Sequence, residues 1–107
     1  MAAILILTTM PDDVSKTDEL SRMLIEERLA ACVNVHAPMT STYRWKGRIE
    51  REAERQLVIK TTRDRLDALR KRLHELHPYE LPEFLVLDVS GSEAYLKWVQ
   101  RETEQSG

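Results

Sequence analysis

The sequence predicts an α+β domain in which helices cover one face of an antiparallel sheet. Three observations lead to this fold class. Runs of apolar or alternating residues mark four extended segments. Two intervening stretches repeat leucine every three or four residues, the period of a helix that buries one side. The segments follow the order strand, helix, strand, strand, helix, strand, and a further helix ends the chain.

The length and composition of the chain predict one folded domain, residues 1–107. An apolar fraction of 42% together with 32% charged residues is typical of a globular chain and not of a disordered one. The net charge of -2 creates no overall field that would attract nucleic acid. We therefore expect no nucleic-acid partner.

The location of the protein is predicted from its cysteine and its apolar segments. The single thiol, Cys32, cannot form a disulfide within the chain. The apolar start has neither a preceding basic residue nor a following small-residue cleavage pattern, so it reads as a strand and not as a signal peptide. No run approaches the roughly 18 apolar residues of a membrane helix. We expect a cytoplasmic protein without a membrane partner.

The first strand and helix are predicted from the segment 3–29. Ala3–Thr9 is almost continuously apolar and is stopped by Pro11, which suits a central strand. Ser15 and Asp18 then match a capping box that begins a helix. The core-facing stripe of this helix consists of Leu20, Met23, Leu24 and Leu29.

A long hairpin follows, with strands over 31–45 and 48–61. Lys46 and Gly47 between them predict a tight turn in which glycine supplies a positive φ. Pro38 cannot donate to a strand ladder, so it marks an edge position or a bulge. The second strand alternates in part. One side is expected to carry Ile49, Ala53, Leu57 and Ile59, and the other Glu50, Glu52, Glu54 and Lys60.

The register of the hairpin stays open at this level. A two-residue turn sets Glu50 opposite Tyr43, and a three-residue turn sets it opposite Arg44. A change of one residue in register moves every side chain to the other face of the strand.

The rest of the chain predicts a helix, a strand and a last helix. The second helix runs over 63–76 and ends at His77-Pro78, because the residue before proline disfavours α geometry. Its buried stripe consists of Leu66, Leu69, Leu73 and Leu76. A strand over 84–89 precedes a helix that Ser92 caps. With right-handed crossovers, the whole order gives a ferredoxin-like βαββαβ sandwich with a C-terminal helix.

The hairpin is too long for the domain that carries it. Its first strand has 15 residues, and at about 3.3 Å each it spans roughly 50 Å, whereas a compact domain of this size measures roughly 34 Å across. The tip carries Tyr43, Trp45 and Ile49. We therefore predict an obligate oligomer in which hairpins extend neighbouring sheets, with Trp45 as the main anchor. The alternative is a bulge at Pro38 that folds the hairpin back onto its own subunit.

Several motifs resemble those of the CutA divalent-cation-tolerance family, and the match runs from about Ile4 to Val99. They are Leu29-Ala30-Ala31-Cys32-Val33-Asn34, Ser41-x-Tyr43-x-Trp45-x-Gly47, Ile59-Lys60-Thr61-Thr62, His77-Pro78-Tyr79-Glu80-x-Pro82-Glu83 and Tyr95-Leu96-x-Trp98. The resemblance implies a ferredoxin-like homotrimer, similar in shape to the PII signalling proteins. It also implies a role in tolerance of copper and other divalent metals.

Three residues are candidate metal ligands: Cys32, His77 and Glu80. Cys32 is either a small buried hydrophobe or a soft ligand for Cu(I). His77 either complements the C-terminal end of its helix or binds a metal ion beside Glu80. Some family members carry a cysteine where Thr8 stands and a second histidine where Leu76 stands, so His77 alone remains of that set. Copper or another divalent cation is the expected ligand, and no cofactor is required.

A second group of residues is predicted to line a cleft between subunits or to form an ion-pair network there. Its members are Lys60, Glu52, Glu54, Tyr79 and Glu83. No phosphate-binding loop or catalytic motif is present in the sequence, so the main hypothesis is a metal-responsive, non-enzymatic trimer. One alternative is a small-molecule sensor or adaptor that uses the cleft, as in PII-like proteins. Another is a hydrolase or transferase with Cys32 as nucleophile and His77 as base.

Overall fold

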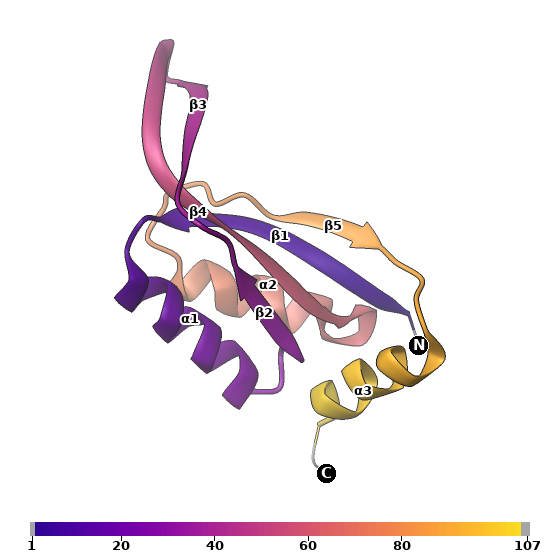
Figure 1. The fold of residues 1–107 in the computed structure, drawn as a ribbon. Coiled ribbons are helices and arrows are strands. Elements are labelled where there is room, and N and C mark those ends of the chain that lie inside the picture. The colour runs from indigo at the N-terminus through magenta and orange to yellow at the C-terminus, as the bar shows by residue number, and fades with distance from the viewer. Residues whose placement is uncertain (1, 106–107) are drawn as a thin grey trace.

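In the computed structural model, residues 2–105 are described; residues 1, 106 and 107 of the predicted domain lie outside this range. The described residues form a five-stranded sheet and three α-helices (Figure 1). In chain order the elements are β1 Ala3–Pro11, α1 Val14–Glu26, β2 Cys32–Val35, β3 Met39–Trp45, β4 Arg48–Thr62, a 3-10 turn Arg63–Arg65, α2 Leu66–Leu76, β5 Leu85–Asp88 and α3 Glu93–Thr103.

The strand order confirms the predicted ferredoxin-like α+β fold. The sheet runs β2-β4-β1-β5 with antiparallel neighbours, and β3 also pairs with β4. β1 is central, as its apolar run predicted. β4 is long enough to pair with β3 through its first half and with β2 through its second half.

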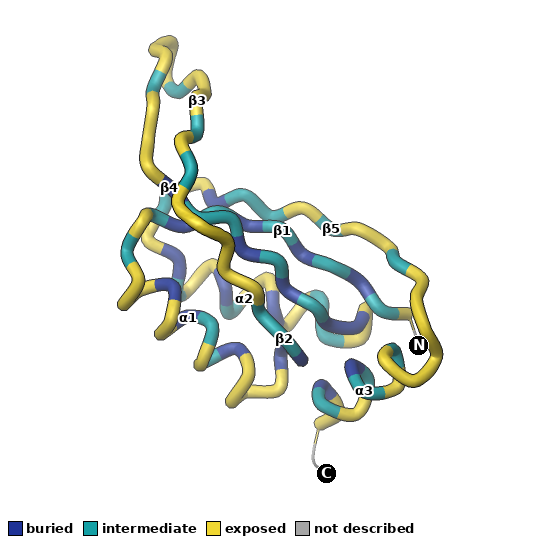
Figure 2. The backbone as a smooth tube through the Cα atoms, viewed as in Figure 1, coloured by how far each residue is buried: buried dark blue, intermediate teal, exposed yellow. Residues whose placement is uncertain are grey.

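The core lies between the sheet and the helices α1 and α2, which cover one face (Figure 1). Buried residues alternate along β1 (Figure 2), and the apolar ones among them are Ile4, Ile6 and Met10. Burial of each such side chain stabilises the fold by about 1.5–3 kcal/mol. The helices contribute Leu20, Leu24, Leu69 and Leu73 to the same cluster.

The start of α1 differs from the prediction. Asp13 is the N-cap, and its carboxylate accepts a hydrogen bond from the Lys16 backbone N–H at 3.1 Å. Ser15, the expected cap, already lies inside the helix. Leu29 is buried, but it lies beyond the helix end and is reached through Arg28, whose φ is 58°. The capping box was therefore wrong by two residues, because an aspartate nearer the strand took the same role.

The hairpin also differs from the prediction, since its first strand is interrupted. β2 ends at Val35 and β3 begins at Met39, directly after Pro38, which has no N–H to donate. The turn itself is as predicted: Lys46 and Gly47 have φ of 50° and 79°, as in a type I′ turn. The two-residue turn places Glu50 opposite Tyr43 and thereby settles the register.

Residues 39–54, here called the hairpin arm, stand out from the body, and the molecule measures 46 × 25 × 23 Å (Figure 1). The prediction that the tip projects is confirmed. The register of β4 is continuous, so the predicted alternation of its two sides holds, but within the arm the apolar side is not buried: Ile49 is 70% exposed and Ala53 is also exposed. Glu54, expected on the polar side, is buried. No helix lies behind the arm, so the alternation of burial holds only from Leu57 onward.

Two buried threonines give a test of the core. Thr8 is fully buried, and its hydroxyl has no hydrogen-bond partner among the described residues. We expect Thr8→Val to raise the free energy of unfolding by about 1 kcal/mol, because it removes an unsatisfied polar group at almost constant volume. Denaturant unfolding at one fixed protein concentration measures the change.

The matched control is Thr61→Val on the neighbouring strand. Thr61 is equally buried, but its hydroxyl donates to the Leu29 carbonyl at 2.7 Å. This substitution should lower the free energy of unfolding by about 1–3 kcal/mol, because it leaves that carbonyl unpaired. Equal losses in the two variants would contradict the assignment of Thr8 as unsatisfied.

Candidate functional site

A groove of 730 Å³ lies between the inner side of the hairpin arm and the segment 78–83 that follows α2. The arm contributes Tyr43, Trp45 and Glu54, and the segment contributes Tyr79, Glu80 and Glu83. Aromatic rings and carboxylates therefore meet in one concave surface. This combination suits a cationic group, which rings and carboxylates both attract.

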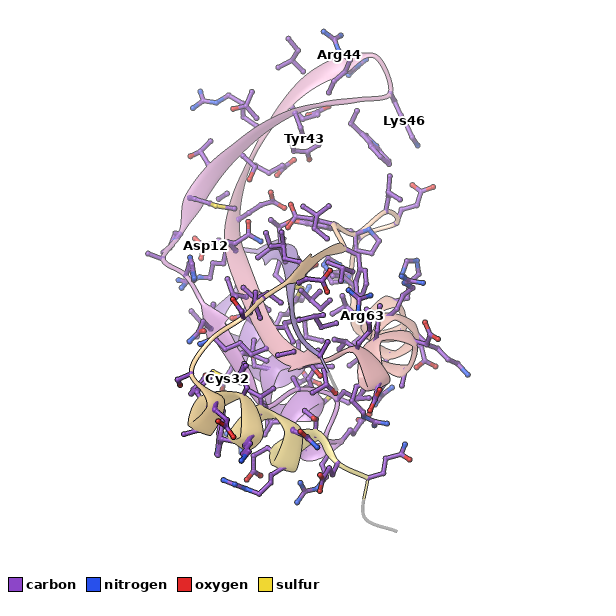
Figure 3. The ribbon with its side chains drawn as sticks, turned by 90° about the vertical axis from the view of Figure 1, so that its right-hand side faces the viewer. Asp12, Cys32, Tyr43, Arg44, Lys46 and Arg63 are labelled. Carbon is purple, nitrogen blue, oxygen red and sulfur yellow. The ribbon has the colours of Figure 1, made fainter. Side chains whose placement is uncertain are left out.

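The register of the arm decides which side chains face the groove. Residues paired across two antiparallel strands point to the same face. Tyr43 pairs with Glu50, and Ser41 pairs with Glu52. Figure 3 shows Tyr43 beneath the arch of the arm and Arg44, the next residue, on its outside. The inner face of the arm thus carries Glu50 and Glu52, with Arg48 opposite Trp45 nearer the tip.

A hydrogen-bonded network fixes the floor of the groove to the sheet. The His77 ring accepts from the Tyr79 backbone N–H through Nδ1 at 3.1 Å, so its proton is on Nε2, which donates to the Thr9 carbonyl at 2.7 Å. The Tyr79 hydroxyl donates to Glu54 Oε2 at 2.6 Å. His77 and Tyr79 thereby hold the segment 78–83 against the point where the arm leaves the body.

Gln56 adds a second attachment in the same place. Its Nε2 donates to the Thr8 carbonyl at 2.7 Å and to Glu83 Oε2 at 2.9 Å. Gln56 was not among the site residues predicted from the sequence. The sequence feature that could have indicated its role is its place as a polar residue just before the apolar run that begins at Leu57.

The two phenols beside the groove both have a raised pKa. Burial, and then the hydrogen bond and charge of Glu54, raise the pKa of Tyr79. Desolvation, and then the carboxylates of Glu52, Glu54 and Glu50, raise the pKa of Tyr43. Both hydroxyls therefore keep their protons at neutral pH. Glu54 is 6% exposed and forms no ion pair with any residue in the described range 2–105.

The three predicted metal ligands do not come together within one subunit. Cys32 is half-buried at the start of β2, opposite Lys60, which itself lies opposite Leu5 on β1. His77 contacts β1 at Thr9, four residues further along. Two strand spacings and four residues place Cys32 roughly 16 Å from Thr9, the residue that His77 contacts. Glu80 is exposed at the groove.

The positions of these residues argue against a shared metal site within one subunit. Over residues 2–105, no group of three or more His, Cys, Asp or Glu side chains is arranged to hold a metal ion. Both His77 nitrogens are engaged, which leaves no lone pair free for a metal. The same separation leaves Cys32 without His77 as a base, because proton transfer needs about 3 Å.

The predicted cleft residues divide between two places. Tyr79 and Glu83 line the groove, and Glu52 lies on the inner face of the arm. Lys60 does not reach the groove: its ammonium lies 5.7 Å from the centre of the Tyr95 ring, beside α3.

Of the predicted interface residues, Tyr43 and Trp45 line the groove. Ile49 lies on the outer face of the arm and is exposed.

Comparison with known proteins identifies the family of this chain. The family model described as CutA1 divalent ion tolerance protein matches residues 4–102. The chain belongs to this family. A divalent-cation tolerance protein CutA from Thermus thermophilus is 38% identical, over 96% of this chain and 99% of the relative. A relative of the same name from Pectobacterium atrosepticum is 43% identical, over 91% and 88%.

Solved CutA structures share the fold throughout. The crystal structure of CutA from Xylella fastidiosa aligns with a TM-score of 0.92 at 44% identity and covers 97% of this chain and 100% of that one. The structure of CutA1 from Oryza sativa gives a TM-score of 0.92 at 34% identity, covering 99% and 97%. The predicted family is thus confirmed for this CutA protein, and with it a role in divalent-cation tolerance. In residues 2–105, no helix has the length and apolar character needed to cross a membrane.

The network around His77 predicts a dependence of stability on pH. Burial lowers the pKa of His77; the Thr9 carbonyl raises it, His74 lowers it, and Glu54 raises it, with a net decrease. An unfolded histidine takes up a proton below about pH 6.5, whereas native His77 stays neutral there. The unfolded state then binds more protons, so the stability present above that pH is lost as the pH falls.

We therefore expect the denaturant midpoint of the wild type to decrease between about pH 7.5 and 5.5, and to decrease less in His77→Asn. At neutral pH the variant itself should be less stable by about 1–3 kcal/mol, because two buried hydrogen bonds are changed. Unfolding curves at fixed protein concentration compare the two slopes. Parallel slopes for both proteins would contradict a neutral, buried His77.

Proposed function

We propose that this CutA protein acts as a non-enzymatic homotrimer in the cytoplasm and supports tolerance of divalent cations, copper among them. The hairpin arm carries the proposal. It carries the exposed Ile49 on its outer face and the rings of Tyr43 and Trp45 on the side of the groove, apolar surface of the kind that a second subunit covers. Solved CutA structures with the same fold support the family assignment on which the proposal rests.

The uncovered face of the sheet supports self-association as well. The helices α1 and α2 cover the opposite face (Figure 1). Leu85 and Leu87 on β5 are 53% and 45% exposed, and the register sets them beside Leu7 and Leu5 of β1. An apolar sheet face of this kind is a favourable surface for contact between subunits.

The edge of β3 offers a further means of association. Within the described chain, β3 pairs with β4 alone, so its second edge presents free backbone N–H and C=O groups. Another subunit can add a strand to such an edge. The arm is therefore suited to extending the sheet of a neighbour.

Copper binding in this proposal depends on Cys32. Its thiol is partly accessible, and a thiolate is the ligand type that Cu(I) prefers. His77 is occupied by Thr9 and Tyr79. The metal-linked role therefore rests on the cysteine, and the acidic groove is a separate feature.

The trimer is tested by Trp45→Ala. We expect the concentration at which subunits dissociate to rise roughly tenfold or more, equivalent to about 1.4 kcal/mol, because a large ring is removed from the contact. Sedimentation over a dilution series measures it. Val14→Ala, an exposed aliphatic position on α1, is the control and should leave assembly unchanged. A wild type that remains a folded monomer at micromolar concentration would refute the proposed trimer.

Copper binding is tested by calorimetric titration with Cu(I) under reducing conditions. We expect Cys32→Ser to weaken binding by roughly tenfold or more, since even outer-shell partners of a metal contribute that much. His77→Asn should bind like the wild type, because neither ring nitrogen is free. The opposite ranking of the two variants would reject Cys32 as the ligand.

A further inference from the structure

A second pocket lies at the end of the molecule away from the hairpin arm, between residues 62–65 and the C-terminal end of α3 (Figure 1). Its volume is 370 Å³, within the range of about 300–1,000 Å³ that is typical of small-molecule sites. The described residues that line it are all polar or charged, and they include Thr62, Asp64, Arg65, Gln100 and Glu104. We call it the helix-end pocket.

Two helix ends of opposite polarity face this pocket. The turn Arg63–Arg65 continues directly into α2, because Arg65 and Leu66 both have right-handed helical backbone angles. The two segments therefore form one helix, and its start lines the pocket with Arg65. The other wall is the end of α3, which has Glu104 at its C-cap. The start of a helix favours a negative group, and the end of a helix favours a positive one.

Arg28 holds the two helix ends together. Its carbonyl accepts a hydrogen bond from Arg65 Nε at 3.2 Å, and its Nη1 donates to the Glu102 carbonyl of α3 at 3.2 Å. The walls of the pocket are therefore fixed relative to each other before a ligand arrives, which lowers the entropic cost of binding. A guanidinium has five N–H donors, so Arg65 keeps its terminal N–H groups for a ligand.

Thr62 supplies a buried hydroxyl without a partner. This residue lines the pocket and is only 3% exposed, yet its hydroxyl makes no hydrogen bond within residues 2–105. It occupies the N-cap position, where a threonine side chain ordinarily accepts from a backbone N–H of the first turn, and Thr62 does not. A buried hydroxyl left unpaired costs free energy, and a polar ligand in the pocket can recover it.

The pocket also contains unpaired charges of both signs. Arg65, Asp64 and Glu104 line it, and none of them forms an ion pair within the described part of the chain. A simple anion placed here would be repelled by the two carboxylates, and a simple cation would be repelled by the guanidinium. A molecule that carries one charge of each sign can satisfy both walls.

We propose that the helix-end pocket binds a small polar α-amino acid in its zwitterionic form. The carboxylate lies at the helix start, where it accepts from Arg65 and from the Thr62 hydroxyl. The ammonium lies at the end of α3, where it donates to Glu104 and to the Gln100 side-chain carbonyl. Because the lining is polar, a small polar side chain is favoured over a large apolar one. This binding is independent of the proposed trimer and metal-linked role, since it uses neither the arm nor Cys32.

Binding is tested by titrating the full chain with L-serine and following the backbone amide resonances by NMR. We expect saturable shifts of the resonances from residues 63–65 and 103–104. Two probes separate the charges: glycerate has a hydroxyl in place of the ammonium, and ethanolamine lacks the carboxylate. Each should bind roughly tenfold more weakly than L-serine, because each loses a charge-assisted hydrogen bond.

Two variants assign the ends of the ligand. Glu104→Gln should reduce the affinity for L-serine roughly tenfold, to the level of glycerate, since it removes the partner of the ammonium. Thr62→Val should also weaken L-serine binding, but without ligand it should not lower the free energy of unfolding, because its hydroxyl has no partner to lose. Glu26→Gln removes the same charge from an exposed position of α1 outside the pocket and should bind L-serine like the wild type.

Three results would overturn the proposal. The first is the absence of saturable shifts at about 10 mM L-serine, a concentration well above a millimolar Kd. The second is an equal affinity for L-serine and one of the two singly charged probes, which would make the pocket a site for simple anions or simple cations. The third is an unchanged affinity in both Glu104→Gln and Thr62→Val, which would place the binding elsewhere on the protein.

Discussion

The strand β4 is the constraint on which the rest of the structure depends. Its 15 residues belong first to the hairpin arm, where they pair with β3, and then to the body, where they pair with β1 and β2. A strand alternates its faces, so one register decides which residues enter the core and which line the groove. This register turns Leu57 and Ile59 toward the helices. It turns Glu50 and Glu52, on the opposite face of the strand, toward the groove side of the arm.

The junction of arm and body is stabilised by polar contacts. His77 bonds to the Thr9 carbonyl, Tyr79 to Glu54, and Gln56 to Glu83. These contacts attach the segment after α2 to the sheet at the point where the arm departs. They also account for a histidine that stays neutral and a carboxylate that is buried, both of which appeared from sequence to be candidates for metal chemistry.

The surfaces proposed for association and the thiol proposed for metal binding lie in different parts of this CutA protein. The arm and the uncovered sheet face are apolar or charged surfaces that a second subunit can cover. Cys32 lies at the other end of β4, opposite Lys60 and far from the groove. One subunit therefore holds no multidentate metal centre within residues 2–105. In the proposed function, the metal-linked role therefore depends on the Cys32 thiol and not on the groove.

The sequence by itself determined the fold class, the succession of helices and strands along the chain, the tight turn at Lys46-Gly47 and the projection of the hairpin. Hydrophobic period, chain length and the conformation of glycine are local properties, and they suffice for these features. Only the tertiary structure decided that the first strand of the hairpin is interrupted at Pro38, that Glu54 is buried, and that Cys32 and His77 lie apart. Those outcomes depend on which segments meet across the sheet, and that information is absent from the spacing of residues along the chain.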